Sequence, residues 1–249
     1  MKKLYKVCWL SAGVSSFVAG YLVRDTVDEF IYIDIADQHP DSLRFIKDCE
    51  NALGKPITIL RSEEYNSVGD VCRTFRFVAS AYGAKCTEVL KKRVRKKWEH
   101  EHEDYEITYV WGFDNKEKRR AERLEDTMTD FKHEFPLIDR NLSKDDVHGI
   151  CAKLGIKRPA LYDMGYSNNN CVGCVKGGAG YWNKIRIDFP DVFADRAKME
   201  REIGHTILRD KNGPIYLDAL DPKRGRMSAE IMEDCSIACE MALGGYDET

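Results

Sequence analysis

The sequence predicts an α/β fold in which helices cover both faces of a mostly parallel sheet. Short runs rich in β-branched and aromatic residues recur through most of the chain. Segments with apolar residues at helical spacing separate these runs. This alternation favours βα units, whose parallel strands present ligands at their carboxyl ends.

The first two expected strands are almost entirely apolar. Residues 4–10 are β-prone, and the uncharged segment after them is expected to continue as a buried helix. Residues 30–35 form a continuous β-branched and aromatic run, which is typical of a parallel strand buried on both faces. The next helix is expected to begin at Asp41 or Ser42, either of which can cap it, and to end at Gly54.

The middle of the chain continues the alternation. Residues 56–60 are expected to form the third strand, and 106–111 the fourth. Helices are expected at 67–80, at 85–98, where apolar residues recur every fourth position, and at 115–128, which is highly charged. These helices are long enough to cover both faces of the sheet.

The pattern changes toward the end of the chain. Residues 135–138 are expected to form a short fifth strand, and Ser143 to cap the helix after it. Beyond Pro159 the alternation stops, and a segment rich in Asn, Gly and Cys follows. We therefore predict an α/β domain over 1–159 and an irregular, cysteine-containing C-terminal cap over 160–249.

The composition is that of an ordinary water-soluble domain. The chain has 249 residues, of which 43% are hydrophobic and 33% charged, with a net charge of −3. No overall basicity favours nucleic acid. An uncharged stretch follows three lysines, as in a signal peptide, but Gly13 and Gly20 interrupt it and no small-residue cleavage site follows. No other stretch approaches the ~20 apolar residues of a membrane span, so we expect a cytoplasmic protein without a membrane partner.

The nine cysteines are an odd number, which favours free thiols or a metal site over a disulfide framework. Cys171 and Cys174 are two thiols on one Gly-containing turn, a spacing that can chelate one metal ion. Four other cysteines fall in apolar patterns and are expected in the core: Cys8, Cys49, Cys72 and Cys151.

A short loop between the first strand and the first helix is the candidate anion site. It consists of Ser11, Ala12, Gly13, Val14, Ser15 and Ser16. A strand, a Gly/Ser loop and a helix together hold a phosphate, because backbone N–H groups and small hydroxyls surround the anion at the helix N-terminus. The alternative is an ordinary tight turn.

Several stretches together resemble one family, the phosphoadenosine-phosphosulfate (PAPS) reductase branch of the PP-loop ATP-pyrophosphatase superfamily, and its phage-encoded members in particular. Ser11–Ser16 resembles the family's SGGxDS loop, Asp34–Ser42 its DTGxxFPET segment, Lys85–Leu90 a Cys-rich K-V-x-P-L stretch, and Gly112–Arg123 a G-x-R-x-x-x-S-x-x-R pattern. Phe135–Cys174 resembles N-P-L-I-D-W-T…P-L-Y-D-x-G-Y…G-C-x-x-C, and Asp234–Ile237 a terminal E-C-G-I/L-H.

The resemblance implies a Rossmann-like (HUP-type) five-stranded sheet in the order 3-2-1-4-5. It also implies that the loop binds the phosphates of ATP or PAPS with Mg²⁺, near Asp34, His39 and Arg123. Three positions depart from the family: Ser15 replaces the loop's Asp, Lys85 replaces a Cys, and Ala238 replaces a His.

The resemblance gives the remaining cysteines their expected roles. Cys235 corresponds to the reductase nucleophile. Cys86, Cys171, Cys174 and Cys239 are the expected metal ligands, for a [4Fe–4S] cluster or, alternatively, Zn²⁺. The iron–sulfur cluster comes first because the family position of the C-x-x-C pair is a cluster position. Zinc is the alternative because Lys85 removes one family ligand, while the terminal pair Cys235 and Cys239 could complete a four-cysteine site.

Two functions remain open. The first is an enzyme of sulfur chemistry, either a sulfonucleotide reductase or an ATP-dependent adenylation and sulfur transferase, which uses a thiol reductant or a sulfur donor. The alternative is a protein that sequesters or hydrolyses a nucleotide signal, with a structural metal site. The basic stretch 91–97 is either a solvated helix face or a contact for a nucleic-acid acceptor. A homodimer is also expected.

Overall fold

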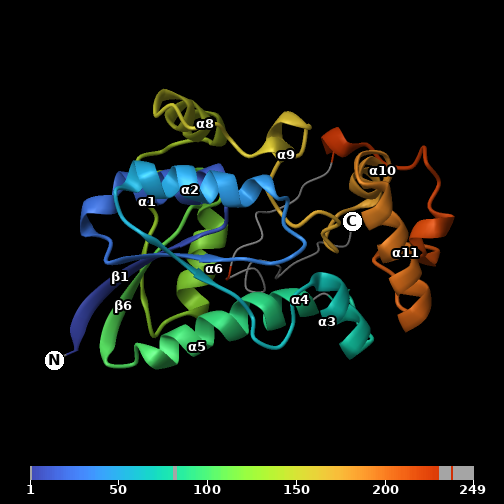
Figure 1. Cartoon of the computed structure of the whole chain (residues 1–249), viewed down its shortest axis with the longest axis horizontal. Helices are drawn as coiled ribbons and strands as arrows, with labels where there is room; N and C mark the ends of the chain where they lie inside the picture. Colours follow the sequence, from blue (N-terminus) through green and yellow to red (C-terminus); the bar gives the residue numbers. More distant parts are fainter. Residues whose placement is uncertain (1, 81–82, 230–236, 238–249) are drawn as a thin grey trace.

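The computed structural model describes residues 2–80, 83–229 and 237, and its centre is a five-stranded parallel sheet (Figure 1). The order is β3-β2-β1-β6-β7, and each neighbouring pair runs parallel. The strands are β1 (Lys3–Leu10), β2 (Glu29–Ile33), β3 (Ile57–Leu60), β6 (Tyr105–Val110) and β7 (Lys132–Glu134). The predicted Rossmann-like α/β class and the order 3-2-1-4-5 are therefore confirmed.

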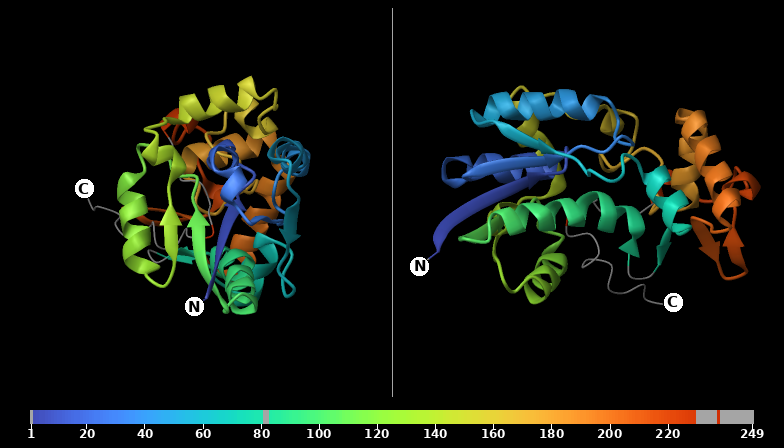
Figure 2. Two further views of the ribbon diagram at one scale, coloured as in Figure 1. Left: turned by 90° about the vertical axis from the view of Figure 1, so that its left-hand side faces the viewer. Right: turned by 60° about the horizontal axis from the view of Figure 1, so that its bottom comes forward.

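Helices cover both faces of this sheet (Figure 2). One face packs against α1 (Val14–Leu22), α2 (Asp41–Leu53) and α8 (Lys144–Lys153), and the other against α3 (Val68–Phe75), α5 (Arg93–Glu101) and α6 (Lys118–Thr127). The side chains of strand β1 alternate between the two faces. Cys8 and Leu10 pack in the apolar cluster under α1, α2 and α8, whereas Val7 and Trp9 pack in the cluster under α3, α5 and α6. The core thus forms two layers, one on each side of the strands.

The fifth strand lies earlier than the sequence predicted. Residues 135–138 do not form it, because Pro136 begins the short helix α7 (Pro136–Asp139). Proline has no N–H for a strand ladder, and its fixed φ suits the first turn of a helix. The strand is the polar segment β7, which pairs only with β6 at the sheet edge, where charged side chains can reach water.

Two expected helices also differ. The helix expected over 67–80 ends at Phe75, and the chain continues into a short hairpin of β4 (Ala79–Ser80) and β5 (Gly83–Ala84). The helix expected over 85–98 begins as α4 (Lys85–Thr87), passes through a π-helix at Glu88–Lys92 and continues as α5 to Glu101. The extra residue per turn in a π-helix rotates the side chains that follow it relative to those before it.

The C-terminal part is more regular than predicted. After α9 (Ala160–Asp163), it forms α10 (Ala179–Asp188) and α11 (Pro190–Ile203), followed by the hairpin β8 (Leu208–Asp210) and β9 (Gly213–Ile215). These elements enclose their own apolar cluster around Tyr181 and Trp182, so the expectation of an irregular cap is wrong for α10 and α11. The division of the chain at residue 159 stays a prediction.

One buried carboxylate organises this part. Glu200 on α11 is fully buried, and it accepts hydrogen bonds from Ile207 N at 2.5 Å and Leu217 N at 2.6 Å. Burial raises the pKa of Glu200, whereas the two N–H donors act in the opposite direction. Within the described part of the chain, no helix is long and apolar enough to cross a membrane.

Replacing Glu200 should loosen the C-terminal part. In Glu200→Ala, the buried N–H of Leu217 and the partly buried N–H of Ile207 lose their acceptor, which costs about 2 kcal/mol of the free energy of unfolding. Urea denaturation followed by circular dichroism measures this loss. Glu202→Gln on the same helix removes a solvent-exposed partner of Arg73 and should have a much smaller effect. Equal effects of the two substitutions would contradict the role of Glu200.

Candidate functional site

The loop 11–16 is closed on itself by the side chain of Ser16. The Ser16 hydroxyl accepts a hydrogen bond from Ser11 N at 3.0 Å and donates one to the Gly13 carbonyl at 3.0 Å. It also lies 3.1 Å from the Ser11 hydroxyl. Ala12, between them, has a left-handed φ of +57°, a conformation that costs about 1 kcal/mol or more in a non-glycine residue and is concentrated at functional sites.

This loop leads directly into the N-terminus of α1. Gly13 is the cap residue in an extended conformation, and no side chain caps the helix. Val14 N donates a long hydrogen bond of 3.4 Å to the Tyr162 hydroxyl. Ser15 and Ser16 are buried in the first turn. The positive end of the helix dipole therefore lies at a loop of small side chains, an arrangement suited to an anion.

A cavity opens beside the loop, at the carboxyl ends of β1, β2 and β6. We call it the loop cavity. Its walls combine two loop hydroxyls, three aromatic rings and one lysine: Trp9, Leu10, Ser11, Ser16, Ile33, Gln38, Lys91, Trp111, Gly112, Phe113 and Ile237. Aromatic and polar groups that converge at this edge of a parallel sheet are typical of a nucleotide pocket.

The structure places three predicted site residues away from these walls. The Asp34 carboxylate pairs with Arg61, at 2.6 Å from its Nη2. The His39 ring accepts from Asp41 N at 3.2 Å and packs edge-on against Phe189. Arg123 donates to the Arg119 carbonyl of its own helix. None of the three lines the loop cavity as the described residues form it.

Three of the predicted metal ligands lie around a second cavity, which we call the cysteine cavity. Cys86, Cys171 and Cys174 line it together with Thr87 and Lys91, among other residues. Lys91 therefore lines both cavities, although only 8% of its surface is exposed. It lies in the π-helix, a local structure that is frequent at functional sites.

The described cysteines do not form a complete metal site. Among residues 2–80, 83–229 and 237, no group of three or more His, Cys, Asp or Glu side chains is arranged to hold a metal ion. Lys85, at the position of a family ligand, pairs with Glu88 at 2.6 Å. Cys235 and Cys239 lie outside the described residues, so the metal centre and the nucleophile stay predictions.

The four cysteines assigned to the core are buried, as predicted. Burial raises the pKa of Cys8 to about 12, and the pKa values of Cys72 and Cys151 to about 11. Burial raises the pKa of Cys49 as well. Thiols held in this protonated state are poor nucleophiles and poor metal ligands.

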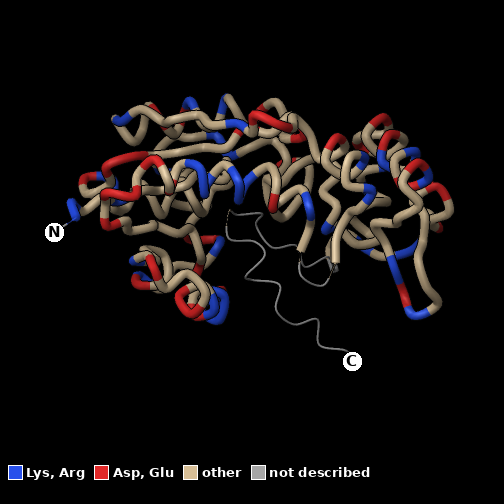
Figure 3. The backbone as a smooth tube through the Cα atoms, turned by 90° about the horizontal axis from the view of Figure 1, so that it is seen from below, with Lys and Arg blue, Asp and Glu red and all other residues tan. Residues whose placement is uncertain are grey.

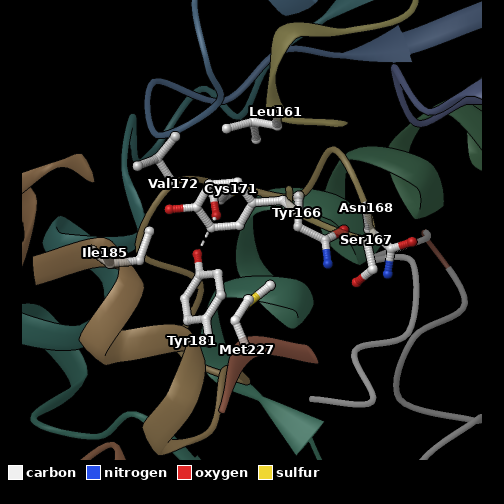
Figure 4. Close-up of a pocket in the computed structure, with 10 residues that line it drawn as sticks. Leu161, Tyr166, Ser167, Asn168, Cys171, Val172, Tyr181, Ile185 and Met227 are labelled. Carbon is white, nitrogen blue, oxygen red and sulfur yellow. Dashed lines mark hydrogen bonds between the residues drawn. The ribbon is translucent and has the colours of Figure 1, made fainter. Parts of the chain in front are cut away.

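The segment that carries Cys171 and Cys174 is fixed by hydrogen bonds on several sides. We call residues 168–174 the cysteine loop. Val172 N donates to the Asp37 carbonyl at 2.8 Å. The Tyr181 hydroxyl accepts from Cys174 N at 2.9 Å and donates to the Cys171 carbonyl at 3.2 Å, the latter drawn in Figure 4. The Cys171–Cys174 turn is thus held in one geometry without a metal.

Two residues that the sequence analysis did not assign complete the site. The Asn169 amide donates to the Ala12 carbonyl at 2.8 Å and to the Ser42 hydroxyl at 3.0 Å, and it is 96% buried, with 4% exposed. Gly112 approaches the loop so closely that a Cβ atom there would lie 2.6 Å from Ser16 Cα. The Asn-rich run and the glycine after a strand were visible in the sequence, but their contacts depend on the tertiary structure.

The basic stretch 91–97 does not form a uniform solvated face. Arg95 is buried and contacts Glu99 at 3.2 Å, and Lys97 pairs with Glu63 at 2.5 Å. Arg93 pairs with Glu64 at 2.8 Å. Figure 3 shows basic and acidic residues alternating along most of the backbone. Several of these cations are already paired with carboxylates, so a nucleic-acid contact here stays a prediction without support from the geometry.

Gly112→Ala should disrupt the loop selectively. The added Cβ would meet backbone atoms of Ser15 and Ser16, which cannot move aside as a flexible side chain can. The loop must shift, and we expect anion or nucleotide binding to weaken by about tenfold or more, the value of one or two hydrogen bonds to a charged group. Calorimetric titration with ATP and PAPS measures the change.

Gly149→Ala is the matched control. A Cβ at this position in α8 meets nothing within 4 Å, and alanine is the better helix former. This variant should bind as the unchanged protein does. If Gly112→Ala also binds normally, the close contact between Gly112 and Ser16 does not control the site.

Comparison with known proteins agrees with this architecture. The family described as the Phosphoadenosine phosphosulfate reductase domain matches residues 6–177. Solved structures that resemble the chain include a phosphoadenylyl-sulfate (PAPS) reductase from Candida auris in a phosphate complex, with 14% identity and a TM-score of 0.47, over 69% of this chain and 82% of that one. No curated protein sequence matches the chain. Because the family match covers more than half of the residues, the chain belongs to the PAPS reductase-like branch of the PP-loop superfamily.

Proposed function

We propose that the protein is an adenine-nucleotide-binding enzyme of sulfur chemistry, in the first place a sulfonucleotide reductase. The observation that carries this proposal is the position of Lys91, which lines both the loop cavity and the cysteine cavity. A group attached to a nucleotide in the first cavity would therefore lie near the thiols of the second. Family membership supports the same class of reaction.

The nucleotide would bind with its phosphates at the loop 11–16. The N–H groups at the N-terminus of α1 and the loop hydroxyls would face the anion. The rings of Trp9, Trp111 and Phe113 offer an apolar surface for the planar base. Lys91 would supply a positive charge for the phosphate or sulfonate end.

The reaction we propose uses two thiols and consumes no other reagent. The Cys235 thiolate attacks the sulfur of the bound sulfonucleotide, and a new S–S bond forms as the S–O bond to the nucleotide phosphate breaks. The nucleotide leaves with the electron pair of that bond. A second thiol, from an external dithiol reductant, then attacks Cys235 and releases sulfite as the S–S bond breaks. This leaves Cys235 in a mixed disulfide with the reductant, and the other thiol of the dithiol displaces it and regenerates the Cys235 thiol. Over one cycle the dithiol is oxidised to a disulfide, and the sulfate-level sulfur of the nucleotide is reduced to sulfite.

ATP-dependent sulfur transfer is the second candidate. The three cysteines around one cavity favour it, because they can carry sulfur next to a bound nucleotide. In this reaction an acceptor oxygen is adenylated by ATP with release of pyrophosphate, and a sulfur nucleophile then displaces AMP. Ser15 in place of the family's acidic residue weakens the case for Mg²⁺ in the first step. Sequestration or hydrolysis of a nucleotide signal is the outcome that remains if neither reaction occurs.

Sulfite release is the test of the first candidate. With PAPS and a dithiol, the protein should release sulfite and adenosine 3′,5′-bisphosphate in equal amounts. Cys235→Ser should reduce the rate by about a thousandfold or more, as loss of a covalent nucleophile does. With ATP, release of AMP and pyrophosphate would instead favour sulfur transfer. Tight binding of nucleotides without either product would exclude both reactions.

A metal centre is a separate proposal, a [4Fe–4S] cluster first and Zn²⁺ second. Its support is that Cys86, Cys171 and Cys174 line one cavity; the described residues do not complete a site, so no step above depends on it. Protein purified without oxygen should carry iron and sulfide, or zinc, and Cys171→Ser should lose the metal. Metal-free protein, or full metal content in this variant, would contradict the proposal. The homodimer, the cytoplasmic location and a nucleic-acid acceptor stay predictions.

A further inference from the structure

A buried amide joins the two loops of the site. Asn169 lies two residues before Cys171 in the sequence, and its Nδ2 donates to the Ala12 carbonyl of the loop 11–16 at 2.8 Å. A carbonyl oxygen only accepts, so the amide nitrogen must face Ala12. The second bond, to the Ser42 hydroxyl at 3.0 Å, anchors the same NH₂ group to the first turn of α2.

These two bonds hold the side chain by themselves. The Asn169 Oδ1 atom is buried and has no hydrogen-bond partner within the described part of the chain. Loss of either NH₂ contact would therefore leave little to fix the amide.

The Ala12 carbonyl, which accepts the Asn169 hydrogen bond, belongs to a residue in an unfavourable backbone conformation. Ala12 has the left-handed φ of +57°, which places it in a sparsely populated conformation that its surroundings must maintain. On the other side, the cysteine loop is held by Tyr181 through Cys171 and Cys174 and by Asp37 through Val172. Asn169 thus connects a strained loop to a rigid one.

We propose that Asn169 is a positioning residue that makes the loop 11–16 and the cysteine loop move as one unit, so that a nucleotide held by the first loop fixes the thiols of the second. The part that concerns the nucleotide rests on the proposed function above. The mechanical coupling between the loops does not, and it can be measured without a ligand.

Hydrogen–deuterium exchange of the ligand-free protein tests this coupling. Tyr181→Phe removes the hydroxyl that holds the cysteine loop and leaves the ring in place. Exchange of amides in the cysteine loop should accelerate about tenfold or more, the effect of losing about 1.4 kcal/mol of hydrogen bonding. Exchange in the loop 11–16 should accelerate as well, although the Tyr181 hydroxyl bonds Cys171 and Cys174 in the cysteine loop and not the loop 11–16.

Asn169→Ala should abolish the effect of Tyr181→Phe on amide exchange in the loop 11–16. With the amide removed, Tyr181→Phe should accelerate exchange in the cysteine loop only, so that the two substitutions are non-additive at the loop 11–16. Asn183→Ala is the matched control, because the Asn183 amide, on the same helix as Tyr181, likewise donates two hydrogen bonds, here to the carbonyls of Asp221 at 2.9 Å and Arg224 at 2.8 Å. This control should leave exchange in the loop 11–16 unchanged.

Two results would overturn the proposal. The first is unchanged exchange in the loop 11–16 of Tyr181→Phe, which needs no Asn169 variant and so stands even if Asn169→Ala does not fold. The second is that Tyr181→Phe accelerates amide exchange in the loop 11–16 equally in the Asn169 protein and in Asn169→Ala. Adding PAPS or ATP then extends the test: a bound nucleotide should slow exchange of the cysteine loop in the unchanged protein and not in Asn169→Ala. Absence of nucleotide binding would refute the proposed function and leave the ligand-free result to decide the coupling.

Discussion

The arrangement of the site depends on Asp37, which follows β2 and contacts three separate parts of the chain. Its carboxylate accepts a hydrogen bond from Val68 N at 2.6 Å, at the start of α3, and forms a buried ion pair with Arg196 of α11. Its carbonyl accepts from Val172 N at 2.8 Å in the cysteine loop. One residue therefore fixes helix α3, helix α11 and the cysteine loop relative to the end of β2. Because removal of one partner from a buried pair leaves an uncompensated charge, such a contact is costly to break, by about 3–5 kcal/mol.

Neighbouring contacts strengthen this junction. Arg73 of α3 binds Asp195 and Glu202 of α11, so α3 and α11 are joined by ion pairs on both sides of Arg196. Gly69 leaves room for both guanidinium groups beside α3. A Cβ atom at this position would lie 2.9 Å from Arg73 Nη1 and 3.0 Å from Arg196 Nη1. Apolar contacts act in the same direction, because Met199 and Ile203 of α11 belong to the same core cluster as Val68 of α3, whereas Trp182 packs within the C-terminal part. Ion pairs and apolar contacts together therefore hold the segment with Cys171 and Cys174 beside the cysteine cavity.

The buried strands and the loop 11–16 could be predicted from the sequence, because hydrophobic periodicity and turn chemistry are local properties. The sheet order is not local, and it was predicted through the resemblance to the family. The fifth strand could not, because β7 is polar and its strand character comes from pairing with β6 at an edge. The helices α10 and α11 were missed because the Gly- and Asn-rich segment before them suggested a loop that continues. Lys91, Gly112 and Asn169 belong to the site through tertiary contacts, which a single sequence does not reveal. Conversely, Asp34, His39 and Arg123 came from family positions, and the structure gives their side chains other partners.

The loop 11–16 also shows how a serine-rich variant of this loop can be ready for an anion before one arrives. The Ser16 hydroxyl is already engaged with Ser11 N and the Gly13 carbonyl, so its first role is to set the shape of the loop. The Tyr162 hydroxyl meets Val14 N only at 3.4 Å, a weak contact that an anion could replace at small cost. The Ala12 carbonyl accepts a hydrogen bond from the Asn169 amide, so this oxygen of the loop already has a donor within the protein. Binding then requires little reordering of the backbone, and preorganisation of this kind leaves more of the interaction energy for affinity.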